Sequence, residues 1–208
     1  MSGSELIRHR HTLGLQAAAL PLGVFCFFAS FGLSVASEAD DDERPLDVSV
    51  DLRGGAKVPE DYAVLFCARG PSVGDRSVSG HAYLIWAYND DRRRACVAES
   101  FGFFPEKDGD VLKSVVADVP GELSASALRN KPSSGECRLV VKVTKAQWEA
   151  TEKIRADWSK REYRLAKKDC VTFAAAVAER LELKLPDRSG VDNLPARYLR
   201  KLAEENKP

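Results

Sequence analysis

Residues 167–174 read Lys-Lys-Asp-Cys-Val-Thr-Phe-Ala, and the expected fold follows from this stretch. Asp169 is a favourable N-cap residue, so a helix is predicted to start at Cys170. Apolar side chains then recur every four residues and predict a helix over 171–183, at Phe173, Val177 and Leu181. Free N–H groups and the positive end of the helix dipole favour a thiolate at such a position, and Lys167 and Lys168 add positive charge. Cys170 is therefore the candidate nucleophile, and the same N–H groups are candidate oxyanion donors.

A thiol nucleophile needs a base within hydrogen-bond distance. The chain has three histidines, and two of them lie before residue 12. The third, His81, follows Gly80 in the stretch 80–88, Gly-His-Ala-Tyr-Leu-Ile-Trp-Ala-Tyr. This run is nearly continuous in apolar character, which predicts a strand covered on both faces. His81 is the candidate general base.

An imidazole base is usually oriented by a polar group on its second nitrogen. The strand expected over 94–103 carries two candidates, Glu99 and Ser100. If the hairpin pairs His81 with residue 99 or 101, Glu99 shares its face, whereas a slip of one residue brings Ser100 there instead. Glu99 is preferred because a carboxylate stabilises an imidazolium better than a hydroxyl does.

The order of elements predicts an α+β fold in which an antiparallel sheet packs against helices. Strands are expected at 62–68, 80–88, 94–103 and 137–143, and helices at 144–161, 171–183 and from 195 onward. Residues 38–61 are an expected exposed leader with at most a short edge strand at 48–52, and 62–208 form one domain. The long connection 104–136 is a candidate wall of a binding cleft.

Residues 1–37 are expected to be a signal peptide that is not part of the folded domain. A basic start at residues 8–11, an apolar stretch at 13–35 and small residues near 37 are typical of a cleaved signal peptide. An uncleaved membrane anchor is the alternative. The expected location is therefore exported, periplasmic or extracellular, with membrane contact only if this segment is retained.

Composition excludes several classes of partner. The 208 residues contain 31 Lys and Arg against 31 Asp and Glu, so no basic footprint for nucleic acid is present. Beyond residue 37 the sequence has one histidine and four cysteines, and the cysteines do not occur in the closely spaced pairs typical of a zinc site. This argues against a metal site, and no cofactor is expected. The disulfide state of three of them stays open, namely Cys67, Cys96 and Cys137. The sequence does not define an oligomeric state.

Taken singly, each candidate has a simpler interpretation. A cysteine at a helix start is more often a small buried hydrophobic residue, and a histidine in an apolar strand is more often a core residue. Glu99 alone is compatible with a surface carboxylate beside an arginine.

Several segments together resemble the circularly permuted branch of the NlpC-type papain-like superfamily, in which histidine precedes cysteine. They are Gly80-His81-Ala82-Tyr83, Glu99 to Pro105, Tyr163-Arg164-Leu165, Asp169 to Ala174 and Leu194 to Leu199. Asp169 stands where this resemblance leads us to expect asparagine. The resemblance implies Cys170 as nucleophile, His81 as base and Glu99 as orienting residue.

The resemblance also implies a function. It is hydrolysis or transfer at an amide through an acyl-thioester, with a peptide or peptidoglycan-like substrate for an exported member. Two alternatives are a catalytically silent papain-like binding module and a lipid acyltransferase of the permuted branch.

Overall fold

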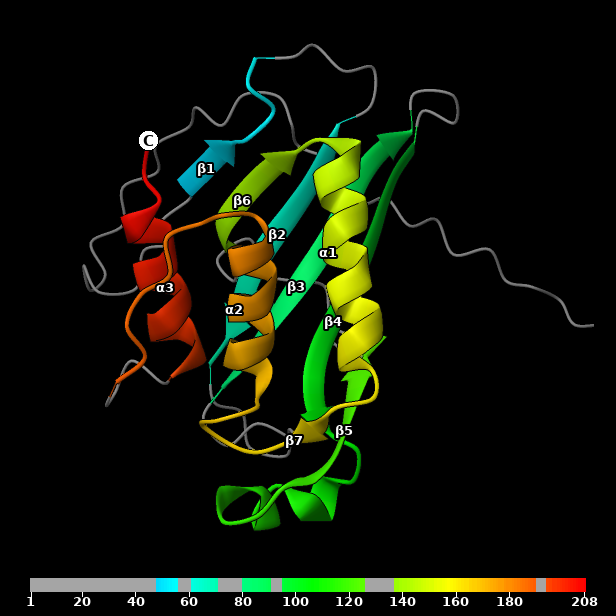
Figure 1. Ribbon diagram of the computed structural model, residues 1–208, viewed down its shortest axis with the longest axis vertical. Helices are drawn as coiled ribbons and strands as arrows, with labels where there is room; N and C mark the ends of the chain where they lie inside the picture. Colours follow the sequence, from blue (N-terminus) through cyan, green and yellow to red (C-terminus); the bar gives the residue numbers. More distant parts are fainter. Residues whose placement is uncertain (1–47, 56–60, 71–79, 91–94, 126–136, 190–193) are drawn as a thin grey trace, which may run out of the picture. The chain divides into compact units, whose positions relative to one another are not determined.

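The computed structural model describes residues 48–55, 61–70, 80–90, 95–125, 137–189 and 194–208. Within them a mixed seven-stranded sheet packs against three α-helices (Figure 1). The predicted α+β class is confirmed. The expected signal peptide and most of the expected leader lie outside the described residues.

The sheet has the strand order β1-β6-β2-β3-β4-β5-β7. Its strands are β1 (Val48–Asp51), β2 (Tyr62–Arg69), β3 (His81–Asp90), β4 (Ala95–Pro105), β5 (Val119–Ser124), β6 (Cys137–Val143) and β7 (Glu162–Tyr163). Neighbouring strands pair antiparallel except β1, which runs parallel to β6. The purely antiparallel sheet of the sequence prediction is therefore corrected, because the short edge strand foreseen at 48–52 joins the sheet in the parallel sense.

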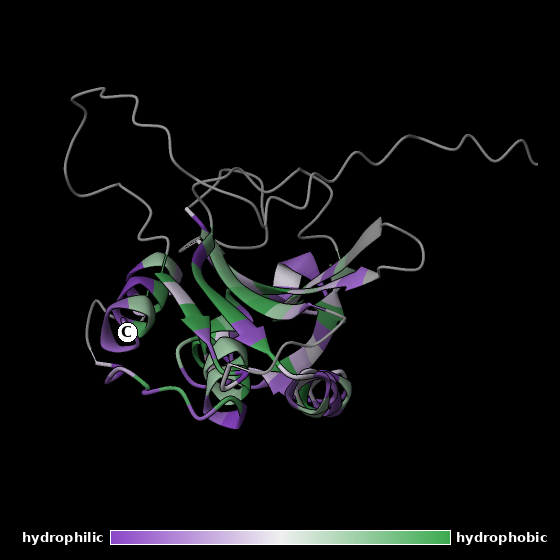
Figure 2. Cartoon of the chain, turned by 90° about the horizontal axis from the view of Figure 1, so that it is seen from above, coloured by the Kyte–Doolittle hydropathy of each residue, from purple (hydrophilic) through white to green (hydrophobic). Residues whose placement is uncertain are grey.

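All three helices cover one face of the sheet (Figure 2). They are α1 (Lys145–Trp158), α2 (Cys170–Arg180) and α3 (Pro195–Glu205). Helix α1 begins with the capping box that its sequence predicts, in which Thr144 accepts from the backbone of Gln147 and the Gln147 side chain accepts from the backbone N–H of Thr144. Helix α2 begins at Cys170 as predicted and ends at Arg180, three residues earlier than expected.

The main core lies between the sheet and the helices. It contains large buried side chains from strands and helices, including Phe66, Leu84, Trp86, Phe173 and Leu199. The indole N–H of Trp86 donates to Thr151 Oγ1 at 2.8 Å, which satisfies its one polar atom inside this core. Burial at this density gives α2 a fixed position against β3.

Strand β3 is buried on both faces, as its apolar run predicts. Ala82, Leu84 and Trp86 face the helices, and Tyr83 and Ile85 face the other side. On that other side Cys67 of β2 and Cys137 of β6 lie directly opposite each other and form a disulfide. The side chain of Cys96 is outside the described part of the chain.

The connection 104–136 contains elements that the sequence did not reveal. Two short 3-10 turns, η1 (Asp108–Asp110) and η2 (Lys113–Val115), precede strand β5. Strand β5 depends on Gly121, because a Cβ there would lie 2.4 Å from the Phe103 ring and 2.7 Å from the carbonyl oxygen of Arg161. Close approach of these segments therefore requires glycine, which is why a breaker residue occurs inside a strand.

Candidate active site

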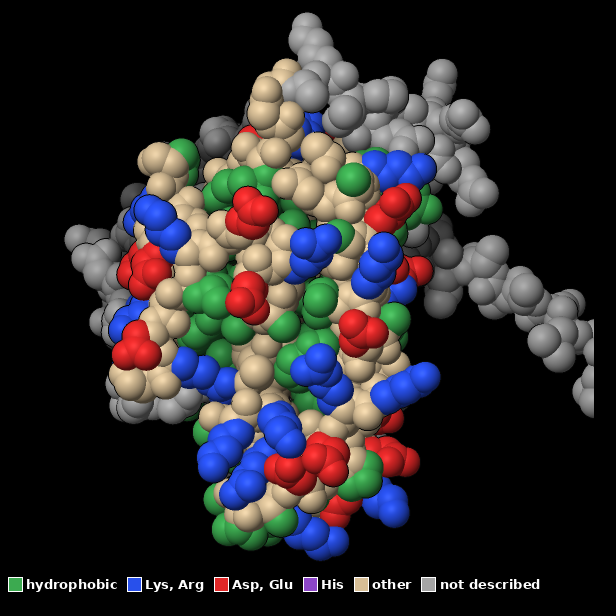
Figure 3. All heavy atoms as spheres, in the orientation of Figure 1, with side chains coloured by type: hydrophobic (Ala, Val, Ile, Leu, Met, Phe, Trp, Pro, Cys, Tyr) green, Lys and Arg blue, Asp and Glu red, His purple; other side chains and the backbone are tan. Residues whose placement is uncertain are grey.

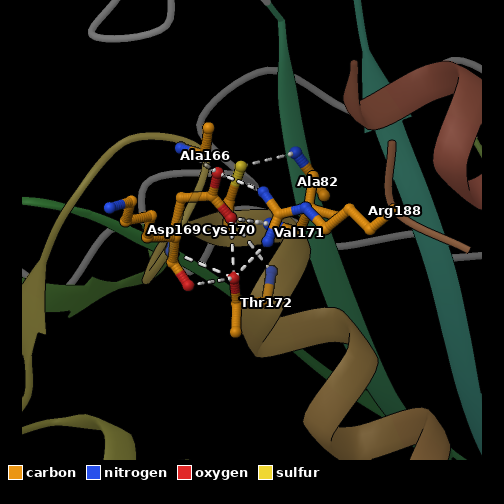
Figure 4. A network of polar contacts seen from close by, with 8 residues as sticks. Ala82, Ala166, Asp169, Cys170, Val171, Thr172 and Arg188 are labelled. Atoms are coloured by element: carbon orange, nitrogen blue, oxygen red, sulfur yellow. Dashed lines mark hydrogen bonds and ion pairs between the residues drawn. The ribbon is translucent and has the colours of Figure 1, made fainter. Parts of the chain in front are cut away.

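The N-terminus of α2 is capped by Asp169. Its Oδ1 accepts hydrogen bonds from the backbone N–H groups of Val171 at 3.1 Å and Thr172 at 3.0 Å (Figure 4). These are the N–H groups that the sequence leaves free for a thiolate or an oxyanion. For these two N–H groups that expectation needs correction, because the N-cap carboxylate accepts from both of them.

The sulfur of Cys170 lies against strand β3. It accepts a hydrogen bond from the backbone N–H of Ala82 at 3.5 Å, across 88 residues of sequence. Ala82 is the residue that follows His81, so the fold brings the candidate nucleophile to the strand of the candidate base. The β3–β4 pairing begins at Tyr83 and Gly102, so Ala82 lies just before its first residue pair.

The surroundings of Cys170 favour its neutral form. The residue is 4% exposed. Burial and then the charge of Asp169 raise the pKa of the thiol to about 12, while N–H groups of Ala82 and Val171 and the charge of Arg188 act in the opposite direction. Cys170 is thus a protonated thiol in the resting protein.

His81 is also buried, at 5% exposure. Side chains alternate along a strand, so the imidazole lies on the face of Tyr83, opposite to the face that α2 covers. There it stacks on Phe104, with ring centroids 3.8 Å apart. Burial, and then the charge of Arg69, lower the pKa of His81 to about 3, which keeps the ring neutral. Among the described residues, no hydrogen bond joins the ring to the Cys170 sulfur.

Glu99 does not orient His81. It pairs with Trp86 across the β3–β4 ladder and therefore lies on the helix-covered face. Its Oε2 accepts from Arg155 Nη1 of helix α1 at 2.7 Å. The predicted role was wrong because the register is displaced: continuing it from Tyr83 and Gly102 places Phe104, not residue 99 or 101, opposite His81.

Ser100 shares the face of His81 but lies opposite Ile85. Between Ser100 and Phe104 stands Gly102, and the His81 ring lies over it, since a Cβ on Gly102 would be 2.1 Å from Nε2. Neither Nε2 nor the Ser100 hydroxyl has a hydrogen-bond partner in the described part of the chain. Position 102, the β4 residue next to Nε2 of His81, therefore has no side chain that could orient the ring.

The positive charge near Cys170 comes from Arg188 and not from the lysines named in the sequence. Lys168 Nζ pairs with Asp118 at 2.8 Å and with Glu162 at 3.4 Å. Arg188 Nη2 instead pairs with Asp169 Oδ2 at 2.5 Å. Sequence reasoning missed Arg188 because it lies in an irregular segment after α2, where no periodicity links it to a distant helix cap.

Two further findings concern the described residues. No group of three or more His, Cys, Asp or Glu side chains is placed there to hold a metal ion. None of the helices in these ranges has both the length and the apolar character needed to cross a bilayer.

Comparisons with protein-family models, with curated proteins and with solved structures gave no match to this chain.

Proposed function

We propose that the domain is an exported cysteine-dependent amidase or endopeptidase of the permuted papain-like type, acting on peptide amides of the cell wall. The observation that supports this best is the contact between Cys170 Sγ and the N–H of Ala82, next to His81. A helix N-terminus and a distant strand meet at these residues, in the chain order that the resemblance implies. The Cys67–Cys137 disulfide is consistent with export, because disulfides persist in oxidising compartments.

The proposed reaction has two steps. The Cys170 sulfur attacks the amide carbon while its proton passes to His81, the C–N bond breaks, and the amine leaves with that proton. Water then attacks the thioester, which releases the acid and restores the thiol. Both groups are neutral at rest, so proton transfer must accompany attack. The imidazole lies on the face of β3 opposite to α2, so the proposal requires a rearrangement that brings ring and sulfur within about 3 to 4 Å when substrate is bound.

The test is hydrolysis by the full chain. Wild type, Cys170→Ala and His81→Ala are incubated with peptidoglycan and with its stem peptides, and newly released amines and carboxyls are identified by mass spectrometry. The proposal expects cleavage by the wild type, none by Cys170→Ala, and a loss of at least about 100-fold in His81→Ala. Equal cleavage by the wild type and His81→Ala would contradict it.

A catalytically silent binding module is the second candidate. It is favoured by Gly102, beside which Nε2 of the imidazole has no hydrogen-bond partner among the described residues, and by Asp169, whose charge opposes a thiolate. In that case the wild type releases nothing, and both wild type and Cys170→Ala co-sediment equally with insoluble wall material.

Lipid acyl transfer is distinguished by its covalent intermediate. Apolar side chains are exposed in the connection 104–136, at the η1–η2 end of the molecule, with Leu112 80% and Val116 75% exposed (Figure 3). Charged side chains surround them, including the Lys113–Asp110 pair, so the surface is mixed rather than wholly apolar. A long-chain acyl adduct on Cys170, seen by intact mass after incubation with phospholipid, would select this activity over amide hydrolysis.

A further inference from the structure

Arg188 links an irregular segment to the start of helix α2. Nineteen residues beyond Asp169, its Nη2 pairs with Asp169 Oδ2 at 2.5 Å, and its Nη1 donates to Thr172 Oγ1 (Figure 4). The guanidinium therefore contacts both the N-cap residue and the third residue of the helix that begins with Cys170. A guanidinium that donates to two different groups at once is fixed in position as well as paired in charge.

Both oxygens of the Asp169 carboxylate accept hydrogen bonds from several groups. Oδ1 accepts from Val171 N, Thr172 N and the Thr172 hydroxyl, and Oδ2 accepts from Ala166 N at 2.8 Å in addition to Arg188. The residue is only 3% exposed. A buried carboxylate one residue from the thiol repels the thiolate strongly unless a cation compensates it.

Arg188 is the compensating cation that the geometry provides. Among the described residues, the other titratable groups near this site are Tyr163 of β7 and, on β3, His81, which precedes Ala82. Burial, and with it the charge of Asp169, raises the pKa of Tyr163, so it is neutral. His81 is neutral as well. The electrostatic balance at the sulfur thus depends on the Asp169–Arg188 pair.

We propose that Arg188 is a positioning residue that sets the acidity of Cys170 by compensating the Asp169 carboxylate. The catalytic consequence rests on the proposed hydrolase function, but the electrostatic relationship does not. Removing the guanidinium makes the thiol less acidic, and removing the carboxylate makes it more acidic. The Asp169 carboxylate also anchors the guanidinium beside the helix start, so without this ion pair Arg188 is no longer held near the sulfur and its effect depends on the presence of Asp169.

The experiment measures the rate of Cys170 alkylation by iodoacetamide as a function of pH in the full chain, with the modified peptide quantified by mass spectrometry. Below the thiol pKa this rate follows the thiolate fraction, so one unit of pKa changes it about tenfold at fixed pH. The variants are Arg188→Gln, Arg188→Lys, Asp169→Asn and the double variant Asp169→Asn/Arg188→Gln. Asparagine retains a side-chain oxygen at the N-cap, so α2 keeps its start in the two variants that carry Asp169→Asn.

The proposal expects alkylation to slow about tenfold in Arg188→Gln, to recover in Arg188→Lys, and to accelerate in Asp169→Asn. In the Asp169→Asn background, Arg188→Gln should change the rate less than threefold. Sub-denaturing urea is added as a control, because a reaction through local unfolding accelerates with urea and one in the native state does not.

The proposal is overturned by an unchanged rate in Arg188→Gln, or by an equal effect of Arg188→Gln with and without the Asp169 carboxylate. Acceleration by urea in Arg188→Gln alone also overturns it, since Arg188 would then only hold the fold. The readout needs no substrate. A protein that shows the expected rates and cleaves nothing therefore contradicts the proposed function and leaves the role of Arg188 intact.

Discussion

Gly102 lies directly against the imidazole of His81: a Cβ at position 102 would be 2.1 Å from Nε2 and 2.8 Å from the Phe104 ring. The imidazole, the phenyl ring that stacks on it and the bare backbone of β4 form one packed unit. The candidate base is held by apolar contacts and by the absence of a neighbouring side chain, rather than by a hydrogen bond at Nε2.

Gly102→Ala should destabilise the protein by about 1 to 3 kcal/mol, because the new methyl group must displace a buried ring. The measurement is the urea midpoint of unfolding. Gly109→Ala is the matched control, since a Cβ there meets nothing within 4 Å. Equal midpoints for the two variants would show that the ring does not occupy this position.

His81 should make the protein less stable in acid. Its pKa is about 3 in the folded state against 6.5 for an ordinary histidine, so above pH 6.5 the ring is neutral in both states and contributes no pH dependence. Between about 6.5 and 3 the unfolded chain binds a proton that the folded chain does not, and stability falls by roughly 1.4 kcal/mol per pH unit. Unfolding free energies of wild type and His81→Gln across this range provide the check. The variant should show the shallower slope, and parallel curves would be contrary to this assignment.

Reduction of the Cys67–Cys137 disulfide should lower stability by about 2 to 5 kcal/mol, because the bond closes a loop across 70 residues of sequence. Denaturant midpoints with and without a phosphine reductant measure the loss. The double variant Cys67→Ala/Cys137→Ala should unfold at a lower midpoint that no longer responds to the reductant. A continued response would assign the effect to another cysteine pair.

Glu99→Gln should change stability by less than about 1 kcal/mol, because Glu99 forms an exposed ion pair. Arg155→Ala should cost more, since its guanidinium also lies 4.4 Å from the Phe101 ring centroid and 5.7 Å from that of Trp86. Thermal melts of the two variants test this order. Cys170 alkylation should be the same in Glu99→Gln as in the wild type, and a slower rate would reinstate Glu99 as a site residue.

Local signals in the sequence were sufficient to predict the position of most helices and strands. Thr144 and Asp169 each fix a helix start through hydrogen bonds within four residues, and the valine-rich stretch of β6 has the bounds 137–143 that were predicted. Such features depend on neighbours in the chain, so they can be recognised without tertiary information.

The candidate site required information that local patterns do not contain. Glu99 was assigned to the wrong face because alternation in a strand fixes two faces but not the register between strands. Arg188 and Gly102 act through contacts with residues 19 and 21 positions away, and no periodicity marks either of them. The Asp169 side chain that predicts the start of α2 also accepts from N–H groups of its first turn. A good N-cap and a free oxyanion site therefore compete for the same donors.

The parallel strand β1 has a consequence for solubility. It covers the outer edge of β6, pairing Val48 with Leu139 and Asp51 with Lys142. Without it, β6 would present unpaired backbone N–H and C=O groups along a run of valines, a surface on which a second molecule can add a strand. A chain shortened to begin at residue 56 would retain the helices and Cys170, yet it would associate edge to edge.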